Sequence, residues 1–89
     1  MGGKPTREFA EVKITYVDRA ATHFILFSEV VRLRAAVRNP LSGATYMLAT
    51  YTVVFQQGRL AAATTGDQVE LDLTEIDNVD ILRTFTAAC

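Results

Sequence analysis

The stretch V-R-L-R-A-A-V-R at residues 31–38 constrains the fold of this 89-residue chain more than any other segment. One set of alternate positions is apolar, and the other carries three arginines. Because successive side chains of a β-strand point to opposite sides of a sheet, this alternation predicts a half-buried strand over residues 30–38. Its apolar face would hold Val31, Leu33, Ala35 and Val37, and its cationic face Arg32, Arg34 and Arg38.

Two segments before this stretch also have periodic patterns. Apolar and polar residues alternate over residues 10–17, which predicts a first strand. Residues 19–29 fit a short helix slightly better than another strand. Ala20, Phe24 and Phe27 have helical spacing, but the run T-H-F-I-L-F is rich in strand formers.

The second half of the chain predicts short strands separated by turns. Proline and glycine in N-P-L-S-G indicate a tight hairpin loop at residues 39–43. The return strand over residues 45–55 is apolar or aromatic on both faces, which is typical of a central strand or of an interface. Gln57-Gly58 and Gly66-Asp67 predict further turns, with short strands at 59–65 and 69–73 and a last strand or short helix at 78–88.

These elements predict a fold class. Consecutive strands joined by turns this short pair as an antiparallel meander. We expect a β-dominated α+β fold, with an antiparallel meander of about five strands and one short helix. The alternative is an all-β roll or a small barrel. The expected organisation is a flexible polar tail at residues 1–8, one small domain over 9–86 and a C-terminal tail at 87–89.

Composition suggests that the chain associates with copies of itself. A domain of this length buries only about 60–65% of its unfolded surface. One cysteine and one histidine provide neither an internal disulfide nor a structural zinc site, yet 49% of the residues are hydrophobic. Small domains without such cross-links often gain stability by oligomerising, so we expect a homo-oligomer.

Charge is distributed unevenly along the chain. Residues 1–44 carry seven Lys/Arg and four Asp/Glu, and residues 45–89 carry two Lys/Arg and six Asp/Glu, which gives +3 and −4 and a total of −1. This balance argues against a general nucleic-acid binder. It suits basic and acidic patches that meet within the fold or across a subunit contact.

The final third of the chain resembles the closing strands of bacterial PH-like domains. The pattern in Q-G-R-L-A-A-A-T-T-G-D-Q-V-E-L-D-L-T-E-I-D-N-V-D-I-L is a glycine turn, an alternating strand and an acidic-Ile-x-x-Val step. The resemblance covers less than a third of the chain, and no functional residue carries over from it.

No sequence motif for catalysis is present. The chain lacks G-x-S-x-G, H-E-x-x-H, P-loop and G-x-G-x-x-G patterns. Its one imidazole, His23, lies in an apolar run, where a core-edge position is the simpler interpretation and a general base the alternative. Six carboxylates between Asp67 and Asp80 lack the spacing of a calcium loop. We therefore expect no metal and no cofactor, and we interpret these carboxylates as a solvated face or as partners for the arginines.

The best candidates for contacts are the three arginines and nearby aromatic residues. Side chains two apart on a strand face lie roughly 6.5–7 Å apart, close to the spacing of successive phosphates in an extended nucleic-acid strand. A tyrosine across the hairpin could stack a base, but solvated or intersubunit ion pairs are the favoured interpretation. The candidate binding residues are Arg32, Arg34, Arg38, His23, Tyr46 and Tyr51.

We therefore expect a non-enzymatic oligomeric interaction or assembly module, such as a small viral, phage or mobile-element protein. Two alternatives remain open. One is a small ligand-binding or catalytic domain with a pocket near His23, Tyr16 and Tyr51. The other is nucleic-acid binding through the arginine face. No apolar run is long enough to span a membrane, and the single cysteine fits a cytoplasmic protein.

Overall fold

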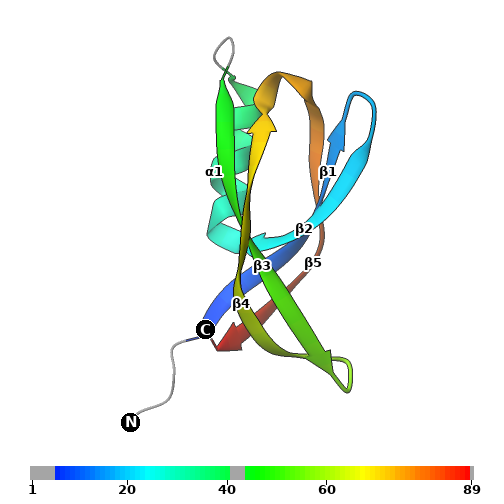
Figure 1. The fold of residues 1–89 in the computed structure, drawn as a ribbon, viewed down its shortest axis with the longest axis vertical. Coiled ribbons are helices and arrows are strands. Elements are labelled where there is room, and N and C mark those ends of the chain that lie inside the picture. Colours follow the sequence, from blue (N-terminus) through cyan, green and yellow to red (C-terminus); the bar gives the residue numbers. More distant parts are fainter. Residues whose placement is uncertain (1–5, 41–43, 89) are drawn as a thin grey trace.

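The computed structural model describes residues 6–40 and 44–88, which form five β-strands, an α-helix and a short 3-10 turn (Figure 1). In chain order the elements are β1 (Thr6–Tyr16), β2 (Ala20–Leu26), α1 (Phe27–Arg38), β3 (Thr45–Gln56), β4 (Arg59–Asp72), the 3-10 turn (Leu73–Glu75) and β5 (Ile76–Ala88). The molecule is elongated, with extents of 47, 25 and 19 Å.

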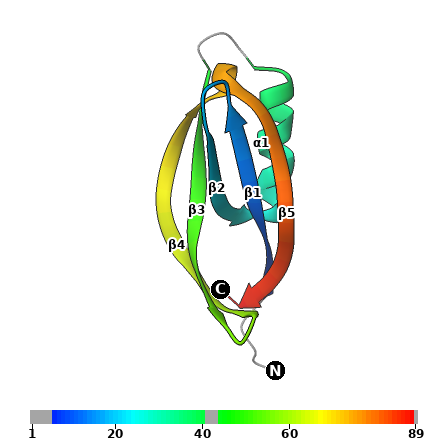
Figure 2. The same ribbon diagram turned by 90° about the vertical axis from the view of Figure 1, so that its right-hand side faces the viewer.

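The strands form two antiparallel sheets, with the orders β2–β1–β5 and β3–β4. Figure 2 shows β4, β3, β2, β1 and β5 next to one another across the molecule. The two sheets also contact each other, β2 against β3 and β4 against β5. Within the described residues, no hydrogen-bonded ladder joins the two sheets at these contacts. The predicted β-dominated α+β fold with a short helix is confirmed. The last segment, for which strand and helix were both open, is a strand that pairs with β1.

Two assignments from the sequence were wrong. The helix α1 lies where a two-faced strand was predicted over residues 30–38, and the strand β2 lies where a helix was predicted over residues 19–29. Val30 and Leu33 are buried, whereas Val31 is 62% exposed. Burial three residues apart is helical, and the same letters that alternate as a strand also include the strong helix formers Leu, Arg and Ala. Packing against the core therefore decided between two patterns that the sequence satisfied equally.

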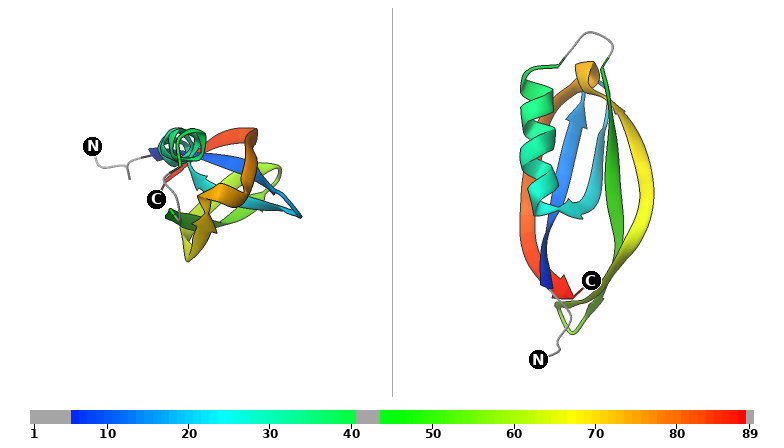
Figure 3. Two further views of the ribbon diagram at one scale, coloured as in Figure 1. Left: turned by 90° about the horizontal axis from the view of Figure 1, so that it is seen from above. Right: turned by 90° about the vertical axis from the view of Figure 1, so that its left-hand side faces the viewer.

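The helix covers only one half of the long axis, which we call the helix half (Figure 3). Val12 and Ile14 of β1, Leu33 of α1 and Leu48 of β3 are fully buried there. The core of this half therefore lies between the three-stranded sheet, the helix and the first part of the β3–β4 hairpin. The buried residues of this core are Ala10, Val12, Ile14, Tyr16, Ile25, Val30, Leu33, Leu48, Leu71, Leu73, Ile76 and Val79.

The β3–β4 hairpin exchanges its buried face halfway along its length. Tyr46 and Leu48 pack against the core of the helix half, whereas Tyr51 and Val53 pack against a second core. The two pairs are an odd number of residues apart, so they come from opposite alternations of the strand. The β3–β4 register shifts between Ala49 and Tyr51, and such bulges bend a strand and increase its twist. Each face of β3 is thus buried over one half of the strand and exposed over the other.

Glycine is required at the point where the register shifts. Gly66 was predicted to be part of a turn with Asp67, but β4 continues through both residues, so that prediction was wrong. A Cβ added at Gly66 would lie 3.2 Å from the Thr50 hydroxyl oxygen and 3.3 Å from the Thr50 carbonyl oxygen. Glycine thus permits a close approach of the two strands rather than a reversal of the chain. The predicted turn at Gln57-Gly58 does reverse the chain between β3 and β4.

The other half of the long axis carries the β3–β4 turn, and we call it the hairpin half. Its buried core is smaller and consists of Phe9, Ala63 and Ala87. The Phe9 ring meets Tyr51 edge-on, with centroids 5.0 Å apart. Aromatic pairs of this geometry add about 0.5–1.5 kcal/mol beyond the burial of area. This end of the molecule therefore depends on a few large rings.

The connection predicted at residues 39–43 joins a helix to a strand rather than two strands. Its residues 41–43 lie outside the described residues. The hydrogen-bonded ladder between the first and last strands runs from Thr6, opposite Ala88, to Tyr16, opposite Ile76. Residues 1–5 and 89 of the two expected tails likewise lie outside the described part of the chain.

The helical register of α1 predicts different effects of the same substitution at two neighbouring positions. Leu33→Asp places an unpaired carboxylate in the core and should lower the free energy of unfolding by about 3 kcal/mol or more. Val31→Asp should lower it by less than about 1 kcal/mol, because that side chain faces solvent. Urea unfolding followed by circular dichroism measures both. Equal losses would contradict the helix, since a strand places Val31 and Leu33 on the same face.

Candidate functional site

The structure does not bring the six predicted contact residues together. Arg32, Arg34 and Arg38 lie on α1, where side chains two residues apart do not share a face. The phosphate-like spacing expected for a strand therefore has no counterpart in the structure. The remaining candidates lie on two strands: His23 on β2, and Tyr46 and Tyr51 at the start and in the middle of β3.

Arg34 fastens the helix to the edge of the three-stranded sheet. Its Nε and Nη2 groups donate hydrogen bonds of 3.2 and 2.9 Å to the carbonyl oxygen of Val79 on β5. The planar guanidinium presents these donors as a rigid fork. An edge strand leaves backbone groups without partners, and covering such an edge with a helix or a side chain protects it from pairing with another chain. We therefore assign Arg34 a structural role.

A shallow groove runs beside this contact. Arg38 and Val37 of α1 line it together with Asp77 and Asn78 of β5, and its volume is about 190 Å³. The Asn78 amide donates a hydrogen bond of 3.0 Å to Asp80. Two arginines, Arg34 and Arg38, line the groove with one carboxylate and one amide. The Arg34 guanidinium already donates to Val79, so the lining selects neither cations nor anions clearly.

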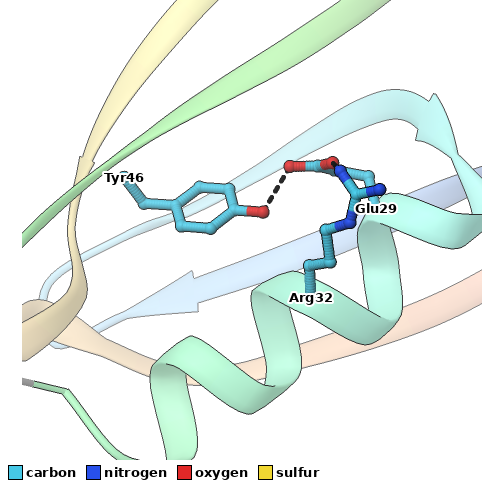
Figure 4. A network of polar contacts seen from close by, with 3 residues as sticks. All are labelled: Glu29, Arg32 and Tyr46. Atoms are coloured by element: carbon cyan, nitrogen blue, oxygen red, sulfur yellow. Dashed lines mark hydrogen bonds and ion pairs between the residues drawn. The ribbon is translucent and has the colours of Figure 1, made fainter.

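Arg32 and Tyr46 meet at a shared carboxylate (Figure 4). The Tyr46 hydroxyl donates a hydrogen bond to Glu29, and Arg32 Nη1 lies 3.5 Å from the other oxygen of the same carboxylate. Burial, the hydrogen bond to Glu29 and the charge of Glu29 raise the pKa of Tyr46 to about 12, while Arg32 acts in the opposite direction. This network joins β3 to α1 across the top of the core.

His23 lies half-buried on β2, opposite Val12. Burial lowers the pKa of His23 below its usual 6.5, and the positive charge of Arg19 lowers it further. The tyrosines expected beside it lie elsewhere. Tyr16 is buried in the core of the helix half with the Arg19 guanidinium 4.1 Å from its ring centre, and Tyr51 packs on Phe9. The structure thus separates the three residues of the expected pocket.

The acidic series remains on the surface. Glu70 and Asp72 of β4 are exposed, and the Asp72 carboxylate accepts hydrogen bonds from the backbone and hydroxyl groups of Thr74. The ion pairs within residues 6–40 and 44–88 use other partners, Arg32 with Glu29 and Arg83 with Glu11. In the same residues, no three His, Cys, Asp or Glu side chains are grouped as metal ligands.

The β3–β4 hairpin also lacks charge over most of its length, a feature outside the residues predicted from the sequence. No Asp, Glu, Lys or Arg occurs in residues 39–58 or 60–66, so Arg59 is the one charged residue over that length. Val54 is nevertheless 50% exposed on β3. This signal is visible in the sequence, but only the structure shows that exposed side chains lie within the uncharged run.

Comparisons with protein families, with curated proteins and with solved structures found no match to this chain. Among the described residues, no helix has the length and apolar character needed to cross a membrane. The strongest feature of the candidate site is the uncharged surface of the hairpin half.

The fork of hydrogen bonds from Arg34 predicts a measurable contribution to stability. Arg34→Ala should lower the free energy of unfolding by about 1–2 kcal/mol, because the Val79 carbonyl loses two charged donors. Arg38→Ala on the same helix should cost about 0.5 kcal/mol or less. Arg34→Lys should fall between wild type and Arg34→Ala, since a lysine cannot reproduce the fork. Equal urea midpoints for all three variants would show that the helix does not depend on this contact.

The raised pKa of Tyr46 predicts a change in stability at high pH. The folded protein keeps the Tyr46 proton up to a pH of about 12, whereas an unfolded tyrosine loses it near 10. The contribution is therefore complete below pH 10 and is lost as the pH rises toward 12. Absorbance at 295 nm of wild type minus Tyr46→Phe isolates this group and should give a midpoint of about 12. A midpoint near 10 would contradict the half-buried hydrogen bond to Glu29.

Proposed function

We propose that this protein is a non-enzymatic interaction module that assembles with further copies of itself through the outer face of the hairpin half. The observation that carries the proposal is a set of cross-strand pairs without charge. Thr52 lies opposite Thr64, and Val54 lies opposite Ala62. Partners in an antiparallel pair project to the same side of the ribbon. We call these four residues, all of them exposed, the uncharged face.

Soluble proteins usually protect such ribbons from association. Exposed strands commonly carry lysines, other charges or prolines, because an uncharged strand surface readily pairs with another chain. The described parts of β3 contain none of these residues, and β4 carries Arg59 alone before Asp67. The inward side of the β3–β4 hairpin is already buried against the two cores. The outer side therefore remains as surface for association.

A second copy is the occupant that this surface fits best. A twofold contact places the same patch on both partners, so an uncharged face needs no complementary charge. The net charge of −1 gives little repulsion between copies. The radius of gyration of 14.0 Å exceeds the roughly 12 Å typical of 89 residues. A chain this extended, with a small core in its hairpin half, gains stability when that half is covered.

The size of the uncharged face sets the expected strength of the contact. Stable complexes bury about 1,200–2,000 Å² in total, and smaller contacts are weak and transient. Because the ribbon is only two strands wide, we expect association at the weak end of this range. Mass measurements must therefore span low to high micromolar concentrations.

Sedimentation equilibrium tests the proposal. We expect the average mass of the wild type to rise from the 9.8 kDa of one chain toward a dimer or larger assembly with concentration. Val54→Glu places a charge on the face and should shift the equilibrium by about tenfold or more toward the monomer. Val54→Lys should act in the same direction, because either charge must be desolvated in the contact.

Val31→Glu provides the matched control, because Val31 is a similarly exposed valine on the outer side of α1. This variant should associate like the wild type. Urea unfolding of the three variants at low concentration shows whether each monomer remains folded. A mass of one chain at every concentration would disprove self-association. Dissociation by Val31→Glu rather than Val54→Glu would place the contact on the helix instead.

A further inference from the structure

A cleft next to the β3–β4 turn has the composition of an anion site. Its volume is about 420 Å³, and it lies between the tip of the hairpin and the end of β5. Both charged residues in its lining are arginines. The lining residues are Phe55, Gly58, Arg59, Leu60, Arg83, Thr84, Phe85 and Thr86.

Two aromatic residues, Phe55 and Phe85, line this cleft. Phe55 of β3, Phe24 of β2 and Phe85 of β5 make a three-ring cluster with centroids 5.6–6.3 Å apart. Phe55 is 36% exposed, so part of its ring meets solvent. The cluster connects the two sheets, because Phe24 and Phe85 belong to the three-stranded sheet and Phe55 belongs to the hairpin. It also offers an apolar surface against which a flat group can pack.

Arg83 is held in place beside these rings. Its Nε donates a hydrogen bond of 2.7 Å to Glu11 on β1. Its guanidinium lies 4.6 Å from the ring centre of Phe55 and 5.4 Å from that of Phe85. A guanidinium has five N–H donors, and no acceptor among the described residues takes the other four. The side chain is oriented in advance while most of its donors remain available.

Arg59 supplies the unbalanced charge. It is exposed at the start of β4, and it donates no side-chain hydrogen bond to the described residues. Glu11 balances the charge of Arg83, so the net charge at the cleft is close to +1. The nearest further carboxylate in the β1–β5 ladder belongs to Glu8, opposite Thr86, and Glu8 lines a different cleft beside Phe27. A single negative charge therefore suits this site better than a multiply charged group.

Gly58 of the β3–β4 turn lines the cleft without a side chain. Gln57 and Gly58 both have positive φ, 52° and 77°, as in the tight turns that join twisted antiparallel strands. A Cβ built on Gly58 would meet no atom within 4 Å, so the space beside it is unfilled. Thr84 and Thr86 of β5 complete the lining of the cleft.

We propose that this cleft binds a carboxylate joined to a planar apolar group, with Arg59 and Arg83 holding the carboxylate and the Phe55 and Phe85 rings packing against the planar group. The same chemistry is found in a free aromatic acid and in the C-terminus of a peptide that ends in an aromatic residue. Arginine donors to a carboxylate form charge-assisted hydrogen bonds, which are about twice as strong as neutral ones. The proposal is independent of self-association through the uncharged face.

Amide chemical shifts in two-dimensional NMR test the site with defined probes. Benzoate represents a free aromatic acid, and N-acetylphenylalanine represents a peptide C-terminus. Acetate carries the charge without the ring, and benzamide carries the ring without the charge. We expect saturable shifts at Gly58, Arg59, Leu60 and Thr84 with at least one of the two aromatic acids. Acetate and benzamide should bind about tenfold more weakly or not at all.

Arg59→Gln is the deciding variant, because this side chain has no described partner whose loss would disturb the fold. It should weaken binding of the aromatic acid by about fivefold or more. Arg38→Gln, in the groove beside β5, should leave the affinity unchanged. Equal affinity for benzoate and benzamide, unchanged affinity in Arg59→Gln, or the absence of saturation at about 10 mM would overturn the proposal. Recording the spectra of Val54→Glu as well separates this result from the outcome for self-association.

Discussion

The exchange of buried faces by the β3–β4 hairpin is the constraint on which the rest of the structure depends. Leu48 belongs to the core of the helix half, whereas Val53 packs against the second core near Phe9. One two-stranded ribbon thus supplies a wall to both cores, and the close approach of Gly66 to Thr50 marks the point of change. Without this change, half of the apolar side chains of β3 would face solvent, because a strand presents alternate residues to opposite sides.

The helix depends on the same arrangement. α1 packs over the helix half alone, where the ribbon leaves room for Val30 and Leu33 against β1. Its polar residues then attach it at both sides. Arg34 donates a hydrogen bond to the Val79 carbonyl of β5, and Glu29 accepts a hydrogen bond from the Tyr46 hydroxyl of β3. These contacts fix the helix against both sheets, which no hydrogen-bonded ladder joins within the described part of the chain.

The hairpin half, at the other end of the molecule from α1, carries two surfaces of different chemistry. The uncharged face carries Val54 on the outside of the ribbon, while the cleft places Arg59 and Arg83 beside aromatic rings. They lie close together because the same tight turn supports both. Few residues are buried in this half, so its side chains are available for contacts with other molecules. The hairpin end, rather than the arginines of α1, is therefore the part of the molecule to which we assign the proposed contacts.

The sequence by itself determined the β-rich α+β class, the strand at residues 45–55 and the turn at Gln57-Gly58, because local alternation and turn chemistry decide these features. It also contained the uncharged run around Val54, whose exposure was not visible. Only the tertiary structure decided that residues 31–38 are helical, since Leu33 satisfies both periodicities until the surrounding strands define what is buried. Likewise, the site at Arg83 depends on Glu11 and Phe55, which are distant in sequence and are brought together by long-range strand pairing and hairpin packing.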